Sequence, residues 1–111
     1  MKKLTLNEQI YLIAVWHLKD EAYGIKIRER ITELTGTPLL FGTLYNTLDS
    51  LVRKNYLRAR KRNPEEDNQN TKRIYYNITP RGIKALQAAW ILQKNLWSGI
   101  ADFPFEAEDR L

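Results

Sequence analysis

The sequence has 111 residues, a formal net charge of +5, one histidine and no cysteine. That length suits one domain with a substantial core and is too short for two. Without cysteine the chain has no disulfides and no thiolate metal sites, which fits a reducing cytoplasm, where we expect it to act. No apolar run approaches the ~20 residues of a membrane span, and the N-terminal residues lack the hydrophobic segment of a signal peptide.

The first predicted helix opens with a capping box at Thr5-Leu6-Asn7-Glu8 and runs to about Leu18. Two of its sides are apolar, and a small domain easily buries only one, so the second indicates a further partner. His17 has no cysteine or second histidine to complete a metal site, so we expect a packed or surface side chain. One apolar side carries Ile10, Ile13, Ala14 and Leu18, and the other carries Leu12, Val15 and Trp16.

A second helix is expected to open between Asp20 and Ala22 and to run to Leu34, with Gly36 as its C-terminal stop. Its expected buried stripe consists of Ile27, Ile31 and Leu34. Thr37-Pro38 then breaks the chain before the next helix. Two helices joined by a short break give the outline of a helix-turn-helix.

The third predicted helix spans residues 41–56 and has one regular apolar face, formed by Leu44, Leu48, Leu51 and Val52. By itself, this periodicity describes any amphipathic helix. The opposite face, however, carries small hydrogen-bonding side chains followed by cations, which suits close approach to base edges and phosphates in the DNA major groove. The candidate DNA-binding residues of this face are Gly42, Thr43, Asn46, Thr47, Ser50, Arg53 and Lys54.

After Tyr56 the pattern changes to the alternation of β-strands, first over residues 57–62 and again over residues 72–78. The polar, turn-rich residues 63–71 between them predict a hairpin with a long tip. The acidic triplet Glu65–Asp67 fits a solvated tip better than a metal site, because no other ligand lies near it in the sequence.

Positive charge is concentrated around this hairpin. Ten of the 18 lysines and arginines lie between Arg53 and Lys84, against three acids, and residues 102–111 hold four of the 13 acids. Such a patch favours a polyanionic partner, nucleic acid before a membrane, although a merely solvated basic face gives the same pattern.

Thr79 and Pro80 open the last predicted helix as N-cap and first-turn residue. One of its two apolar stripes has the alternating three- and four-residue steps of a seam between helices, and we predict it to be a dimer interface. The other can cover the core of the chain itself, and burial of both stripes within one chain is the alternative. The predicted interface residues are Ile83, Leu86, Trp90, Gln93, Trp97 and Ile100, and the second stripe holds Ala85, Ala89, Leu92 and Leu96.

The element order predicts a mainly α fold with a β-hairpin, a winged helix-turn-helix extended by a C-terminal helix. We expect a DNA-binding domain at 1–78, a dimerisation helix at 79–101 and an acidic tail at 102–111. The segments AYGIKI (22–27), GTLYNTLDSLVRKNYL (42–57) and RIYYNITPRGIKAL (73–86) resemble the PadR family of bacterial transcriptional regulators. The resemblance runs from Thr5 to about Ile100 and fits the compact branch with a single short C-terminal helix. One departure is Asn55, where the family more often has glycine.

The resemblance implies a homodimeric repressor that binds a pseudo-palindromic DNA operator and needs no cofactor or metal. By position in the family pattern, Tyr23 and Tyr45 would contact phosphates. Thr43, Asn46 and Thr47 would lie at the groove. The resemblance assigns the wing contacts to Arg60, Arg62, Lys72 and Arg73.

The same resemblance suggests a flat aromatic effector. Compact members of the family include regulators that hold such compounds between tryptophans of the two subunits. We therefore expect a flat, apolar or cationic ligand at Trp97, with Trp16 as a wall. Trp90 also belongs to this candidate site, although burial in the dimer core explains it better, because Leu86 and Ala89 lie beside it to fill the seam.

Two other classes of function fit the sequence less well. An enzyme is disfavoured, because the sequence has no phosphate-binding glycine loop and no acid pair or nucleophile with a supporting group. A winged helix that binds protein without sequence-specific DNA binding is the main alternative. RNA binding is disfavoured because residues 72–78 lack the glycine-aromatic pattern of an RNA-recognition strand.

Overall fold

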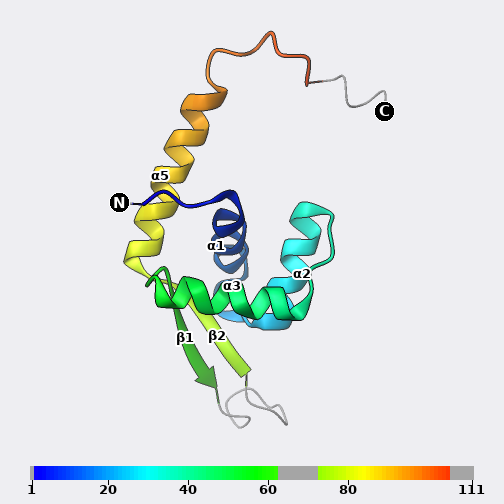
Figure 1. Cartoon of the computed structure of the whole chain (residues 1–111), viewed down its shortest axis with the longest axis vertical. Helices are drawn as coiled ribbons and strands as arrows, with labels where there is room; N and C mark the ends of the chain where they lie inside the picture. The colour runs from blue at the N-terminus through cyan, green and yellow to red at the C-terminus, as the bar shows by residue number, and fades with distance from the viewer. Residues whose placement is uncertain (1, 63–72, 106–111) are drawn as a thin grey trace.

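The computed structural model describes residues 2–62 and 73–105 (Figure 1). Its elements are, in order, α1 (Leu6–Leu18), the 3-10 turn η1 (Lys19–Glu21), α2 (Gly24–Thr35), α3 (Phe41–Arg53), β1 (Leu57–Arg62), β2 (Arg73–Ile78) and α5 (Pro80–Trp97). In Figure 1, α3 crosses in front of α1, the hairpin of β1 and β2 extends below them, and α5 rises past the body of the protein. This is the mainly helical fold with a two-stranded hairpin that the sequence predicts.

The capping box of α1 is present as predicted. The backbone N–H of Glu8 donates to Thr5 Oγ1 at 3.1 Å, and the backbone N–H of Thr5 donates to Glu8 Oε1 at 2.9 Å. The predicted apolar sides of this helix were wrong in detail. The core covers a single face that takes residues from both, so Ile13 of one side and Trp16 of the other are exposed. The buried face comprises Glu8, Tyr11, Leu12, Ala14 and Val15.

The helix α2 begins at Gly24, later than predicted, because residues 19–21 form the separate turn η1. Its predicted stop is confirmed, since Gly36 has a left-handed φ of +74° and donates its N–H to the Thr32 carbonyl at 2.8 Å. Ile27 and Ile31 are buried, but the prediction for Leu34 was wrong. That side chain is 47% exposed, because the last turn of α2 extends past the core.

The helix α3 ends at Arg53, three residues earlier than predicted, because the chain turns at Asn55. Asn55 has a left-handed φ of +63°, which asparagine tolerates better than most residues, so the departure from glycine leaves the turn intact. Tyr56 and Leu57 then enter the core at the start of β1. The three leucines at positions 44, 48 and 51 are fully buried, as the periodicity predicts.

The hairpin pairs β1 and β2 in antiparallel register, from Leu57 opposite Ile78 to Arg62 opposite Arg73. The start of α2 adds a third short edge, because Tyr23 forms a bridge with Tyr75 and the N–H of Tyr76 donates to the Ala22 carbonyl at 2.8 Å. Tyr75 and Tyr76 are both buried, so neither ring is free to stack on a base. Lys72, the hairpin tip at 63–71 and residues 106–111 of the acidic tail lie outside the described residues.

The helix α5 starts on the turn that follows α3. Thr79 caps it as predicted, accepting from the Gly82 N–H at 3.0 Å while its hydroxyl donates to the Asn55 carbonyl at 2.6 Å. At Gly82 a Cβ would overlap the carbonyl oxygen of Tyr56, so only glycine fits this close approach. Ala85 and Ala89 then pack on the core.

Beyond Ala89, α5 extends away from the body of the protein (Figure 1). The helix ends at Trp97, and Gly99 has a φ of +78°. Ile100 therefore lies beyond the helix, which corrects its prediction as part of a continuous helical stripe. Within the described ranges, no helix combines the length and the apolar character needed to cross a membrane.

Candidate nucleic-acid interface

The predicted DNA-binding residues of α3 lie on the side away from the core. They differ in exposure, and the exposed ones are the side chains most accessible to a ligand. Gly42, Thr43, Tyr45, Asn46, Arg53 and Lys54 are exposed, whereas Thr47 and Ser50 are half-buried.

Thr47 lies beside the buried ring of Tyr11 from α1. The Tyr11 hydroxyl is inaccessible and makes no hydrogen bond of standard geometry within the described residues. Burial raises the pKa of Tyr11, and the neighbouring Thr47 hydroxyl opposes that rise. Thr47 is therefore turned partly toward α1, and Asn46 is the more accessible of the two.

Tyr45 packs against the first residue of α2. A Cβ at Gly24 would overlap the Tyr45 hydroxyl oxygen and lie 2.8 Å from Cζ of the same ring, so glycine makes room for this phenol. Tyr23, the residue before Gly24, is half-buried. The structure thus brings both tyrosines that the resemblance assigns to phosphates to the start of α2. Among the described residues, the N-cap residue Tyr23 makes no capping hydrogen bond with its side chain at this helix end.

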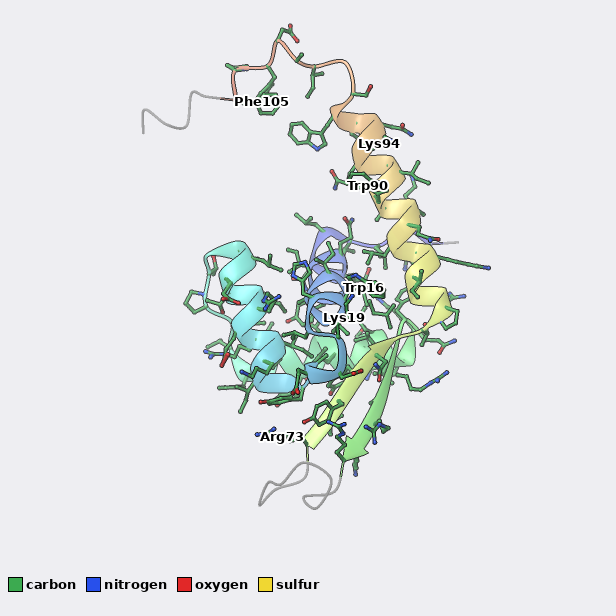
Figure 2. All side chains as sticks on the ribbon, turned by 180° about the vertical axis from the view of Figure 1, so that it is seen from behind. Trp16, Lys19, Arg73, Trp90, Lys94 and Phe105 are labelled. Atoms are coloured by element: carbon green, nitrogen blue, oxygen red, sulfur yellow. The ribbon has the colours of Figure 1, made fainter. Side chains whose placement is uncertain are left out.

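A stack of two rings between two cations connects the hairpin to the start of α2. The guanidinium of Arg62 lies 4.5 Å from the centre of the Tyr75 ring, which lies 5.3 Å from the Tyr23 ring. Arg73 is the first residue of β2 and lies at the lower end of this strand in Figure 2. Its guanidinium lies 4.2 Å from the centre of the Tyr23 ring. A ring face attracts a guanidinium electrostatically, so such contacts help to hold both arginines in place. Arg60, on the same hairpin, is exposed.

Lys54 has a structural partner that the sequence did not reveal. Its Nζ lies 2.7 Å from Glu8 Oε2 in an ion pair that joins the end of α3 to the start of α1. Burial alone would raise the pKa of Glu8, but the hydrogen bonds from Lys54 and Thr5 outweigh it and lower the pKa below 4.5. Lys54 is therefore held by a carboxylate.

Two residues that the sequence analysis missed also shape this surface. Arg28 of α2 donates its Nε–H to the Leu39 carbonyl, and its guanidinium lies 4.5 Å from the Phe41 ring centre, so it braces the turn between α2 and α3. Asp49 is exposed on α3, one turn after Tyr45. Burial, followed by the charge of Asp49 and by Tyr45, raises the pKa of Tyr76 in β2 to about 12. Asp49 could have been noticed in the sequence as an acid on the polar face of α3. Nothing in the sequence indicated the contacts of Arg28 with Leu39 and Phe41.

The candidate effector residues fall into two places. Trp90 and Trp97, which are 65% and 55% exposed, line a shallow surface groove on α5 together with Gln93, Lys94 and Ser98. Trp16 lies apart on α1, where the Lys19 ammonium sits 3.4 Å from the centre of its ring (Figure 2). One chain therefore does not bring the three tryptophans together.

The end of the described chain returns to Trp97. The indole Nε1–H of Trp97 donates to Gln93 Oε1 at 3.1 Å, and the Phe105 ring lies 5.7 Å away (Figure 2). Of the predicted interface residues, Ile83 is exposed like both tryptophans, Leu86 packs on the core, and Gln93 is half-buried. Within the described parts of the chain, no three side chains of His, Asp or Glu are grouped so that they could hold a metal ion.

Comparison with known proteins supports a role for this surface in nucleic-acid binding. Residues 13–88 match the sequence model of the transcriptional regulator PadR-like family. A search among proteins with curated functions found no match.

Three solved structures share the fold. A PadR family transcription regulator from Clostridium difficile is 25% identical, with a TM-score of 0.65, and the match covers 89% of this chain and 95% of that one. A transcriptional regulator from Clostridium thermocellum is 27% identical, with a TM-score of 0.62 and coverage of 86% and 90%. A winged-helix DNA-binding protein from STIV is 20% identical, with a TM-score of 0.65 and coverage of 88% and 98%. The chain therefore belongs to the PadR-like family of transcriptional regulators, which are winged-helix DNA-binding proteins and not enzymes.

Proposed function

We propose that this protein is a homodimeric repressor that recognises a specific, pseudo-palindromic DNA operator in the cytoplasm. The observation that carries the proposal is the exposed polar face of α3, which lies beside the stack of Arg62, Tyr75, Tyr23 and Arg73. A recognition helix next to a cationic hairpin can place side chains at base edges while the hairpin holds the DNA backbone.

The residues divide by chemistry into two groups. Hydroxyls and cations position the protein on phosphates without regard to sequence, whereas the small polar groups of α3 read bases. We assign positioning to Tyr23, Tyr45, Arg53, Arg60, Arg62, Lys72 and Arg73. We assign base contacts to Gly42, Thr43, Asn46, Thr47 and Ser50. Asn46 is the foremost of these, because its amide is exposed whereas the neighbouring Thr47 is half-buried. Lys54 contributes mainly through its ion pair with Glu8.

Dimerisation is proposed through the exposed part of α5. Several large apolar side chains are exposed together on this helix, and an exposed apolar patch is typical of an interaction site, which favours a second copy of the chain. On this proposal residues 1–78 bind DNA, residues 79–101 dimerise, and the two half-sites lie about one helical turn apart, or ~10 bp. The proposed interface consists of Ile83, Leu86, Trp90, Gln93, Trp97 and, beyond the helix, Ile100.

Selection of binding sites from random duplexes, followed by salt titrations, tests the proposal. We expect a two-fold symmetric consensus and affinity that falls steeply with salt, because each neutralised phosphate releases counterions. Arg60→Ala should weaken binding to all duplexes alike, whereas Asn46→Ala should narrow the gap between operator and random DNA by ~1–3 kcal/mol. Equal affinity for every duplex would contradict sequence recognition and favour a protein-binding winged helix.

We further propose that a flat aromatic compound, apolar or cationic, releases the DNA. Its site would be built on the groove of Trp90 and Trp97, with Trp16 as a wall supplied when the dimer forms. The compound would act only if it prefers a dimer geometry with the wrong half-site spacing.

Quenching of tryptophan fluorescence by planar dyes tests the effector site. We expect quenching in the parent protein, its loss in Trp97→Ala, and a smaller change in Trp90→Ala. Quenching that survives the loss of Trp97 would place the site elsewhere, and the absence of any binding would leave the tryptophans as dimer core.

A further inference from the structure

The exposed side of α3 carries one negative charge that the assignments above do not use. Asp49 is the only acid in α3, and it lies three residues after Asn46 and four before Arg53. All three side chains are exposed. The carboxylate therefore sits within the surface that the proposed function directs at DNA.

No structural role accounts for this carboxylate. Asp49 has no hydrogen bond or ion pair within residues 2–62 and 73–105, and Arg53, although one turn away, is not paired with it. Acids stabilise helices in the first turn, whereas Asp49 is the ninth of 13 residues. Aspartate is also a weak helix former, so helix propensity does not account for this residue either.

The location of Asp49 is fixed by its neighbours. It follows Tyr45 by one turn, and its charge acts on the buried ring of Tyr76 in β2. By helical spacing, Asp49 therefore shares the exposed face of α3 with Asn46 and Arg53, among the residues proposed to contact DNA. A groove-bound base edge at this point would be flanked by phosphates on both strands.

A carboxylate in that position is unfavourable unless it receives a hydrogen bond. DNA repels it through every nearby phosphate, and a carboxylate can only accept. The major groove offers amino donors on cytosine and adenine alone. The amino group of adenine stands beside the N7 acceptor, which repels a carboxylate, whereas that of cytosine stands beside a carbon. Cytosine is therefore the base edge that suits Asp49.

We propose that Asp49 is a specificity-determining residue that accepts a hydrogen bond from the 4-amino group of a cytosine in each half-site. The inference rests on the proposed sequence-specific binding and deepens it. The carboxylate selects in two ways, because it rewards cytosine at one position and weakens binding to every duplex that lacks cytosine there. A low affinity for random DNA is thus part of its effect.

The test compares the parent protein with Asp49→Asn and Asp49→Ala in site selection and in titrations of duplexes. At the position read by Asp49, a change from cytosine to thymine replaces the amino donor by an acceptor. We expect it to weaken the parent by about 5- to 100-fold and either variant by about twofold or less. Both variants should also bind random duplex several-fold more tightly, because one repulsive charge is gone.

The matched control is Asp102→Asn, which makes the same change in net charge in the exposed segment after α5, at the opposite end of the molecule from the hairpin (Figure 1). This variant should keep the affinities and the consensus of the parent. Thermal unfolding of all four proteins should coincide within a few degrees, since both aspartates are exposed.

The outcomes separate this inference from the proposed function. A parent that selects no consensus would overturn sequence-specific binding and the role of Asp49 with it. A parent that selects a consensus, with Asp49→Asn selecting the same bases at the same ratios, would overturn only the role of Asp49. Equal changes in Asp102→Asn would reduce the effect to net charge and would also overturn it.

Discussion

The two halves of α5 differ both in the size of their side chains and in their surroundings. In the first half, Thr79, Gly82 and Ala85 bind the helix to the turn after α3, and small residues let the backbone approach closely. In the second half, Trp90 and Trp97 are more than half exposed on a helix that has left the body of the protein. Small side chains therefore mark where α5 meets its own chain, and large exposed ones mark where we propose that it meets another.

This contrast predicts two kinds of mutational effect. Substitutions in the first half should lower the stability of the isolated chain at any protein concentration. Substitutions in the second half should leave that stability intact and change only the dependence of unfolding on concentration, because dimerisation is a mass-action effect.

The largest effect is expected for Gly82→Ala. Its Cβ would overlap the Tyr56 carbonyl oxygen, which is backbone and cannot rotate away, so we expect a loss of about 3 kcal/mol in the free energy of unfolding. Urea denaturation measures this loss. The matched control is Gly99→Ala, where no atom stands within 4 Å and only the left-handed φ of +78° opposes the change, at about 1 kcal/mol. Equal losses at the two glycines would contradict close packing as the cause.

For the second half the corresponding change is Trp90→Ala. We expect the dimer dissociation constant to rise by about 30-fold, or 2 kcal/mol, as for a tryptophan at the centre of an interface. Sedimentation equilibrium measures the constant. Gln87→Ala, also exposed on α5 but outside the proposed stripe, should leave it unchanged. Retention of the dimer in Trp90→Ala would remove Trp90 from the interface.

The ion pair of Glu8 and Lys54 supports the core on which the first half of α5 rests. Because the folded protein lowers the pKa of Glu8 from 4.5, the stability it contributes is complete above about pH 4.5 and is lost as the pH falls through the lowered value. We expect Glu8→Gln to cost about 1 kcal/mol at pH 7, after allowance for the half-exposed lysine. The difference from the parent in urea denaturation should shrink toward pH 3, at every protein concentration. A constant difference across this range would show that the charge of Glu8 is not involved.

Features that depend on a few neighbouring residues could be predicted from the sequence. The capping box of Thr5 and Glu8, the stop at Gly36 and the cap at Thr79 are local patterns, and each is present. The fold followed from their order and from the resemblance to the family.

Contacts between distant parts of the chain could not be predicted. Lys54 finds Glu8 across 46 residues, and Tyr23 meets Tyr75 only because the start of α2 pairs with β2. Which apolar residues of α1 are buried likewise depends on the elements that cover the helix, so Trp16 could not be placed by periodicity. For the same reason, the sequence did not show which polar side chains of α3 interact with other elements, such as Thr47 with Tyr11 and Asp49 with Tyr76.

The smallest expected effect on stability belongs to Gly24→Ala, which sharpens the contrast with Gly82. Here the atom in the way is the far end of a side chain, the Tyr45 phenol, which can rotate. We expect the free energy of unfolding to change by no more than about 1 kcal/mol, since alanine also favours the helix. Affinity for all duplexes should fall alike, because Tyr45 leaves its proposed phosphate. Tyr45→Phe should cause a similar fall, and the double variant should lose no more than either single one. Additive losses would mean that Gly24 affects DNA binding by a route other than Tyr45.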